Sequence, residues 1–368
     1  MHIGMGTGFA HQRGAAYDDA RLIREEFENC VLAEELGFDS VWITEHHFSD
    51  YSICTNPLQA LTYLAGRTKR IRLGTQVIVV PWHDPVRLAE QIILLDHVSN
   101  GRTILGFGRG LARHEFQGLR IDQSQARELY NEILSLVIPA LETGWIEGGE
   151  IFQQPRRELR PRPLYTFEGR KFCGSYSESS LEVAARLGFG RIVLMLPQRG
   201  AVPEPDDYAA AWQRVHGPGT EPPRPCVSGQ VFVDDSADRA LEIGSRHVAH
   251  TMRAAIVNYE MDSDVVSKIP GYEAYAKRVI PPERIEDTVA AFGETVISGT
   301  PQMVVERMEE LKRIYDPQAF MPHYYYGGMP QDEAVRNMRM FAAKVMPEIK
   351  SWTATSSLDD AFLKARAA

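Results

Sequence analysis

The stretch Arg70–Gly108, RIRLGTQVIVVPWHDPVRLAEQIILLDHVSNGRTILGFG, predicts a strand, a helix and another strand in direct succession. Residues 70–80 form an apolar strand run, and Asp84 with Pro85 supplies the N-cap and first-turn residues that begin a helix. The apolar residues of this helix lie largely on one face: Val86, Leu88, Ala89, Ile92, Leu95 and Val98. A second strand run, residues 102–108, follows the helix. Strands that alternate with helices favour a parallel βαβ topology.

The same alternation extends outward over the whole chain. The other strand runs are HIGMGT (residues 2–7), SVWIT (40–44), KFCGS (171–175), RIVLML (191–196), CVSGQVFV (226–233) and AFMPHYYY (319–326). Helical patterns follow them at about residues 22–36, 56–64, 124–143, 177–188, 206–215, 236–292 and 332–346. Eight strand–helix units in one chain predict a (β/α)8 barrel, also called a TIM barrel. A doubly wound open sheet is the alternative.

We expect a single barrel domain over residues 1–368. Two segments have the character of insertions. A proline-rich segment at about 144–170 follows the fourth strand and its helix, and a charge-rich segment at about 250–292 comes after the seventh strand. Residues 350–368 form a C-terminal tail.

Composition and charge exclude several classes of function. The chain is 44% hydrophobic and 24% charged, as soluble globular proteins are, and its net charge of −9 disfavours binding to nucleic acid or to an anionic membrane. Its four cysteines share no short spacing, so we expect neither a metal site nor a disulfide framework. We find neither the pattern of a signal peptide nor an apolar run long enough for a membrane span. We therefore expect a cytoplasmic protein.

The first candidate site residues follow the second strand run directly. In barrels of this kind, active sites lie in the loops after the carboxyl ends of the strands. Glu45, His46 and His47 occupy this position. Neighbouring side chains of an extended segment point in opposite directions, so we expect one histidine to face the mouth. The alternative is that both histidines only cap the strand end through backbone hydrogen bonds.

The fourth and fifth strand exits together suggest a phosphate site. In GFGRGLARHEF (residues 106–116), glycines surround Arg109, a cation suited to bidentate phosphate binding. No dinucleotide-binding fingerprint follows these glycines. Ser177 and Ser180 stand where the next helix begins, and a helix N-terminus attracts anions. Ordinary N-capping is the alternative for either serine.

Four stretches resemble the bacterial luciferase-like flavin-dependent monooxygenases, and they occur in the order that the family has. They are AEELGFDSVWITEHHF (33–48), residues 70–116, VISGTP (296–301) and GGMPQDEAVRNMRMFAAKVMP (327–347). The resemblance covers most of the chain. It implies a (β/α)8 barrel that binds reduced FMN at its C-terminal mouth. It also implies dioxygen as co-substrate, a separate flavin reductase that supplies the FMN, and a homodimer.

The resemblance also implies roles for single residues. His46 matches the family's general base, and Arg109 matches the arginine that binds the FMN phosphate. Ser177 and Ser180 match the two hydroxyl residues of the helix-start phosphate site. The Gln76-Val77 pair matches a cis peptide bond under the flavin ring.

Two positions depart from the light-emitting luciferase subunit. Gly108 replaces a reactive cysteine, and Tyr176 replaces a glutamate of the phosphate site. Both positions are expected at the cofactor site, but luminescence with a long-chain aldehyde is not expected.

The function implied is oxidation of a small, mainly apolar organic molecule through a peroxyflavin. His46 would move a proton, Glu45 would either fix the tautomer of His46 or pair with an arginine, and His47 would be structural or face the substrate. Residues 250–292 are the candidate lid. Two alternatives remain: a deazaflavin-dependent oxidoreductase that transfers hydride, and a non-catalytic flavoprotein partner subunit.

Overall fold

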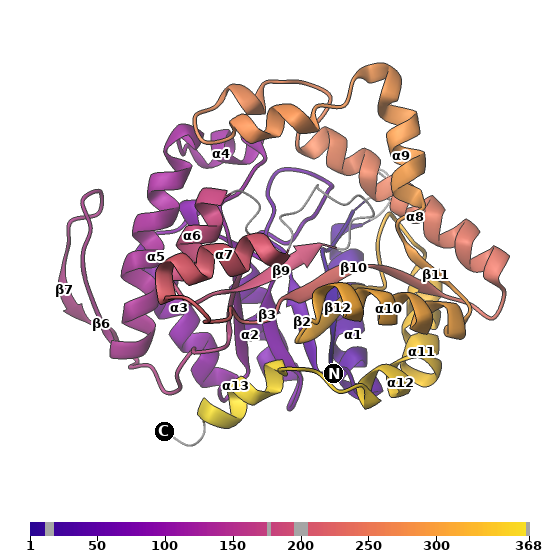
Figure 1. The fold of residues 1–368 in the computed structure, drawn as a ribbon, viewed down its shortest axis with the longest axis horizontal. Helices are drawn as coiled ribbons and strands as arrows, with labels where there is room; N and C mark the ends of the chain where they lie inside the picture. Colours follow the sequence, from indigo (N-terminus) through magenta and orange to yellow (C-terminus); the bar gives the residue numbers. More distant parts are fainter. Residues whose placement is uncertain (12–17, 175–177, 195–204, 366–368) are drawn as a thin grey trace.

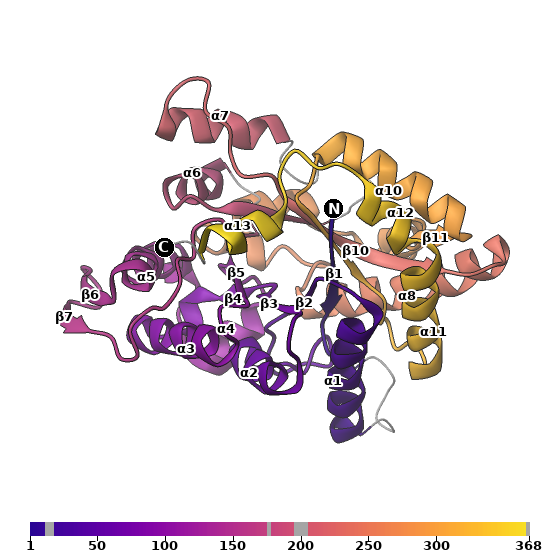
Figure 2. The same cartoon turned by 90° about the horizontal axis from the view of Figure 1, so that it is seen from below.

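The computed structural model describes residues 1–11, 18–174, 178–194 and 205–365. Within these residues, eight parallel strands form a closed barrel surrounded by helices (Figures 1 and 2). They are β1 (His2–Thr7), β2 (Ser40–Ile43), β3 (Arg72–Thr75), β5 (Thr103–Gly108), β8 (Lys171–Cys173), β9 (Gly190–Leu194), β10 (Cys226–Val233) and β12 (Ala319–His323). The barrel closes where β10 pairs with both β9 and β12. The predicted TIM barrel is confirmed, and the open-sheet alternative is excluded.

The helices of the outer ring lie close to the predicted ranges, except α10, which was not predicted. They are α1 (Asp19–Leu36), α2 (Pro57–Arg67), α3 (Pro85–Val98), α5 (Ala126–Thr143), α6 (Glu178–Arg186), α7 (Pro205–His216), α10 (Pro301–Tyr315) and α11 (Gln331–Lys344). The side chains of Asn56 and Asp84 accept hydrogen bonds from backbone N–H groups in the first turns of α2 and α3. Gly37 ends α1 in the left-handed conformation. None of the helices in the described residues is both long and apolar enough to cross a bilayer.

The strand predicted over residues 70–80 is wrong in its second half. β3 ends at Thr75, and the chain then forms the short strand β4 (Ile78–Val79), which pairs with β5, and the 3-10 turn η1 (Val80–Trp82). Ile78 and Val80 are fully buried in this irregular segment. Hydrophobicity alone therefore did not distinguish a continuous strand from a buried turn.

The single helical region predicted at 236–292 is also wrong. The chain forms α8 (Ala237–Asn258), three 3-10 turns, η3 (Val266–Lys268), η4 (Glu273–Arg278) and η5 (Pro282–Arg284), and then α9 (Ile285–Gly293). Pro270, Pro281 and Pro282 cannot donate backbone hydrogen bonds, so a continuous helix is impossible here. The helix α4 (Arg113–Leu119), the turn η2 (Gln123–Gln125) and the strand β11 (Ile297–Gly299) are among the elements that were not predicted. β11 extends the sheet beside β10.

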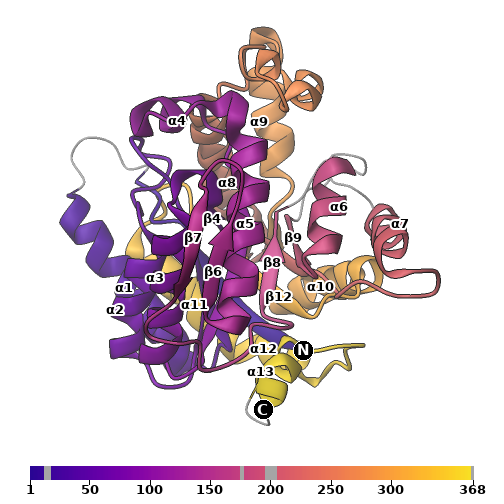
Figure 3. The ribbon, with the colours of Figure 1, turned by 90° about the vertical axis from the view of Figure 1, so that its left-hand side faces the viewer.

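An antiparallel hairpin of β6 (Trp145–Gly148) and β7 (Gln154–Glu158) lies outside α5 (Figure 3). It falls in the proline-rich segment that follows the fourth barrel strand and its helix. The charge-rich segment after the seventh barrel strand, β10, instead lies over the end of the barrel where the strands finish (Figure 1).

A helix near the C-terminus of the chain closes the barrel interior at the end where the strands begin. Trp42, Ile104, Phe172 and Met321 from four different strands form an apolar cluster inside the barrel. After α12 (Met346–Ser351), the last described helix, α13 (Leu358–Ala365), crosses this end (Figure 2). It adds two buried side chains to the cluster, Leu358 and Phe362.

We predict that the Phe362→Ala variant is less stable than the parent protein by about 3–5 kcal/mol, because a buried ring is lost from a packed interior. Unfolding in urea, followed by circular dichroism, measures the change. Leu363 is the matched control because its side chain is 70% exposed, so Leu363→Ala should change the free energy of unfolding by less than about 0.5 kcal/mol. Equal stability of the two variants would mean that α13 is not part of the core.

Candidate active site

His46 lies in the loop after β2, and a buried carboxylate holds its ring. The distance from His46 Nδ1 to Glu115 Oε1 is 3.0 Å. The same carboxylate oxygen accepts a hydrogen bond of 2.8 Å from the backbone N–H of His47. Glu115 belongs to α4 and is 1% exposed. An ionised carboxylate can only accept, so His46 Nδ1 carries the proton and Nε2 is left as the basic nitrogen.

Two tyrosines lie beside the ring of His46, and one of them reaches Nε2. The hydroxyl of Tyr259, at the end of α8, lies 3.4 Å from His46 Nε2. The ring of Tyr51 meets the imidazole edge-on, with 4.9 Å between the ring centroids. Burial raises the pKa of both phenols, so they stay protonated at neutral pH. The basic nitrogen therefore faces a protonated phenol, and the His46 side chain is 14% exposed.

Glu45 has neither of the two roles considered for it. Its carboxylate accepts a hydrogen bond of 2.6 Å from the backbone N–H of Val79 and lies 3.0 Å from His83 Nε2. Burial acts to raise the pKa of Glu45, but hydrogen bonds from His47 and His83 outweigh it and hold the pKa below its ordinary value. Glu45 thus ties the β2 loop to the segment after β3.

Glu115 was not predicted from the sequence to be the partner of His46. Glu115 is 69 residues away along the chain, and its place in the HEF triplet after Arg113 gives no local signal of the contact. His46 and His47 do point to different partners, as expected for neighbouring residues of an extended segment. His46 meets Glu115, whereas His47 lies near Glu45 and the ring of Trp82.

A small cavity of about 30 Å³ lies between the exits of β5 and β8. Its lining residues are Arg109, Arg127, Tyr130, Asn131, Gly174, Ser180 and Val183. The guanidinium of Arg109 stacks over the ring of Tyr272 at 4.1 Å, and its buried Nη1 has no hydrogen-bond partner within the described part of the chain. A buried cationic donor without a partner fits an anionic ligand such as a phosphate.

The structure brings together some of the predicted phosphate-site residues. Arg109 and Ser180 line the same cavity, at the start of α6, and Arg127 is a second guanidinium that sequence reasoning missed. Its signal was weak, because it lies within an ordinary amphipathic helix. Ser177 and Tyr176 lie outside the described residues, so their predicted roles stay predictions.

The peptide bond between Gln76 and Val77 is cis, as the resemblance implies. The side-chain amide of Gln76 donates a hydrogen bond of 2.7 Å to the hydroxyl of Ser228. At Gly108, an added Cβ would collide with the side chain of Val77. The close approach of Val77 therefore explains why this position has no side chain. The positions of Gln76, Val77 and Gly108 relative to a flavin ring stay predictions.

Residues of the segment 250–292 contact both candidate sites. Tyr259 lies against His46, and Tyr272 lies against Arg109 and donates a hydrogen bond of 3.0 Å to the carbonyl oxygen of Gly110. Glu260 forms a two-pronged ion pair with Arg113. The segment thus covers the base and the cavity together.

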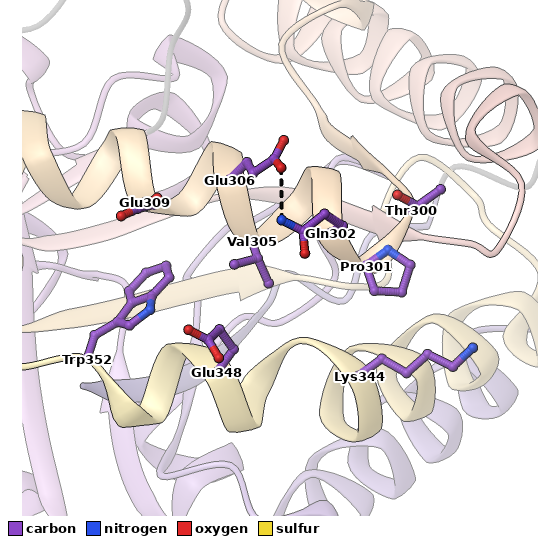
Figure 4. Close-up of a pocket in the computed structure, with 9 residues that line it drawn as sticks. All are labelled: Thr300, Pro301, Gln302, Val305, Glu306, Glu309, Lys344, Glu348 and Trp352. Atoms are coloured by element: carbon purple, nitrogen blue, oxygen red, sulfur yellow. Dashed lines mark hydrogen bonds between the residues drawn. The ribbon is translucent and has the colours of Figure 1, made fainter.

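A larger groove of about 720 Å³ lies on the outer helical layer, between α10 and the helices α11 and α12 (Figure 4). Its polar side chains interact largely with one another or with nearby residues. Gln302 donates to Glu306, and Lys344 pairs with Asp235. This groove contains none of the predicted site residues.

A sequence profile described as "Luciferase-like monooxygenase" matches residues 1–316. The chain belongs to this family. The predicted family is therefore confirmed, and with it the enzyme class at the level of the family, that of flavin-dependent monooxygenases.

Relatives in this family include an uncharacterised protein of Sinorhizobium fredii, y4vJ, 33% identical over 51% of this chain and 54% of that protein. The alkanal monooxygenase alpha chain of the Kryptophanaron alfredi symbiont is 26% identical over 90% of this chain and 94% of that protein. The oxygenase component of a flavin-dependent trigonelline monooxygenase from Acinetobacter baylyi is 33% identical over 39% of this chain and 41% of that protein. The chain thus spans about half the length of the first of these relatives.

Several solved structures share the fold. Monooxygenase RslO1 from Streptomyces bottropensis has a TM-score of 0.72 at 22% identity, covering 95% of this chain and 100% of that one. The oxygenating constituent of 3,6-diketocamphane monooxygenase from Pseudomonas putida, in complex with FMN, has a TM-score of 0.69 at 16% identity, covering 97% and 99%. An F420-dependent secondary alcohol dehydrogenase has a TM-score of 0.64 at 14% identity, covering 94% and 98%.

We predict that Arg109→Ala binds reduced FMN about ten- to a hundredfold more weakly, because the loss of a charge-assisted contact costs about 1.5–3 kcal/mol. Anaerobic fluorescence titration measures the affinity. Arg87→Ala is the control, since Arg87 forms an exposed ion pair on α3 with Glu90. Unchanged FMN affinity in Arg109→Ala would contradict the assignment of the cavity.

Proposed function

We propose that this protein is the oxygenase of a two-component monooxygenase, which uses reduced FMN and dioxygen to oxidise a small organic molecule. The observation that carries the proposal is the His46–Glu115 pair. This pair presents a basic nitrogen at the barrel mouth. The same mouth holds a cavity suited to a phosphate. Membership of the luciferase-like family supports the same chemistry.

Arg109 and Arg127 are suited to hold the FMN phosphate, with the start of α6 beside them. When bound, reduced flavin supplies the electrons that activate dioxygen. The residues of the chain orient the reactants, exclude water and handle protons. A flavin reductase would supply the reduced FMN, as the name "oxygenase component" of the Acinetobacter relative suggests for that protein.

His46 takes up or releases a proton at Nε2. Glu115 keeps the proton on Nδ1, and its charge stabilises the imidazolium form while the ring is protonated. Tyr51 and Tyr259 limit the access of water to this nitrogen. The segment 250–292 is the proposed lid, because its tyrosines lie on both sites at once.

The proposed assembly is a homodimer in the cytoplasm. The alternative cofactor is a deazaflavin that transfers hydride without oxygen, and the F420-dependent structural neighbour shows that the same fold accommodates such a cofactor elsewhere. Turnover assays with reduced FMN and with reduced deazaflavin, in air and without oxygen, distinguish these functions. No turnover with either cofactor would favour a non-catalytic partner subunit.

We predict that His46→Ala slows substrate oxidation by about 10²–10⁴-fold, the usual contribution of a general acid or base. Reduced FMN should bind almost as tightly as before, because the phosphate cavity is formed by other strands. The hydrogen peroxide released per flavin consumed should rise. Single-turnover kinetics with reduced FMN and a working substrate measures these quantities.

His47→Ala is the matched control for this prediction, because the imidazole of His47 faces Glu45 and Trp82 instead. It should slow the chemical step much less. The assignment of the base is off by one residue if His47→Ala is the slow variant. If neither variant is slow, both histidines only stabilise the strand end.

We predict that Glu115→Gln slows oxidation by at least about tenfold, because groups that orient a functional histidine typically contribute 10–100-fold. The amide keeps the shape of the side chain but can donate to Nδ1, which would move the ring proton of His46 to Nε2. NMR of ¹⁵N-labelled histidine detects that tautomer directly. Glu45→Gln is the control, and it should leave the tautomer of His46 unchanged. An unaltered His46 spectrum in Glu115→Gln would refute the orienting role.

A further inference from the structure

The barrel interior becomes polar at its mouth. Ala319 and Met321 of β12 and Cys226 of β10 belong to the apolar cluster inside the barrel. Side chains two residues apart on a strand share a face, so His323 and Ser228 also point into the barrel, nearer its mouth. These two residues and Gln76, just after β3, replace the apolar interior with hydrogen-bonding groups.

Gln76 and Ser228 are joined across the barrel. β3 and β10 are separated by β12, β1 and β2, and the 2.7 Å bond from Gln76 Nε2 to Ser228 Oγ spans the interior between them. The other amide atom of Gln76, Oε1, is buried and has no partner in the described parts of the chain. The hydroxyl of Ser228 accepts the amide hydrogen and has its own proton available to donate. A buried, unpartnered acceptor is costly unless a ligand satisfies it.

His323 is the third member of this group. Its ring lies directly over Gly6 of β1, where any side chain would collide with the imidazole. No hydrogen bond to its ring nitrogens is found within the described residues. Burial lowers the pKa of His323 to about 4, so the ring is neutral at pH 7 and has one donor and one acceptor.

The strand register brings His323 close to Ser228. On the neighbouring strands β10 and β12, Gln230 pairs with His323 and Ser228 pairs with Met321. Strand spacing and rise then place the Cα atoms of Ser228 and His323 about 8 Å apart. One small polar group between them can reach both side chains. β12 lies across the barrel from β5, and β10 lies two strands from β8; the exits of β5 and β8 form the phosphate cavity.

We propose that Gln76, Ser228 and His323 form a subsite that binds a neutral, hydrogen-bonding group of the substrate, such as a hydroxyl or a primary carboxamide. This inference rests on the proposed oxygenase function and specifies its substrate class. Both donors and acceptors are present and none is charged, so the group must be polar and uncharged. The substrate is then not purely apolar at the end that enters the barrel.

The test is the binding of small isosteric pairs, phenol with toluene and benzamide with acetophenone, measured by ligand-observed NMR without oxygen. The parent protein should bind the member that carries an O–H or N–H donor, phenol or benzamide, about tenfold or more tightly in at least one pair. In His323→Phe and Ser228→Ala, the two members of that pair should differ in affinity by no more than about threefold. Met321→Leu changes the same interior face but no hydrogen bond, and it should keep the ratio. Ser228→Ala, the smaller change, decides the matter if His323→Phe does not fold.

The affinity for reduced FMN is the second readout. It should stay within about twofold of the parent value in both variants. A tenfold loss would overturn the proposal, because the polar groups would then serve the flavin ring. The proposal also fails if the parent protein shows no preference in either pair, or if the variants keep it. These measurements need no turnover, so an intact preference without any oxygenation would support the subsite and refute the proposed function.

Discussion

The pairing of β9 with β10 is the constraint on which the sites of this protein depend. It closes a sheet that would otherwise have two free edges, and closure brings all eight carboxyl ends of the strands to one rim. Residues from distant parts of the sequence can then share a site. His46 follows β2, Glu115 follows β5 and Tyr259 lies at the end of α8, yet the side chains of Glu115 and Tyr259 both contact His46. An open sheet would leave the exits of β9 and β10 far apart.

The sequence predicts the architecture well because the architecture depends on local, repeated signals. Apolar runs, the N-caps Asn56 and Asp84 and the C-cap Gly37 each report on a few neighbouring residues. The segments whose secondary structure was predicted wrongly lack such a signal. Ile78 and Val80 are as apolar as strand residues but lie in a buried irregular turn, and the prolines after α8 divide a charge-rich region into short turns.

The candidate site was only partly predictable for a related reason. His46 and Arg109 follow strands directly, so their position at the rim follows from the barrel alone. Glu115, Arg127 and Tyr272 contribute through contacts set by the packing of α4, α5 and the segment after α8. The acidic residue next to His46 in the sequence was considered as its partner, but extended neighbours point apart, and Glu45 bonds to His83 instead. Proximity in sequence was misleading where the backbone is extended.

The pairing of β1 with β12 has a consequence for folding during synthesis. β1, the first strand, is hydrogen-bonded on one side to β12, the last, and α13 covers the interior only after β12 is in place. During synthesis, the first strand must therefore wait for nearly the whole chain to emerge before its second neighbour exists. Its apolar residues Ile3 and Met5 stay without their final contacts throughout that time. The barrel can therefore close only after β12 and α13 have left the ribosome.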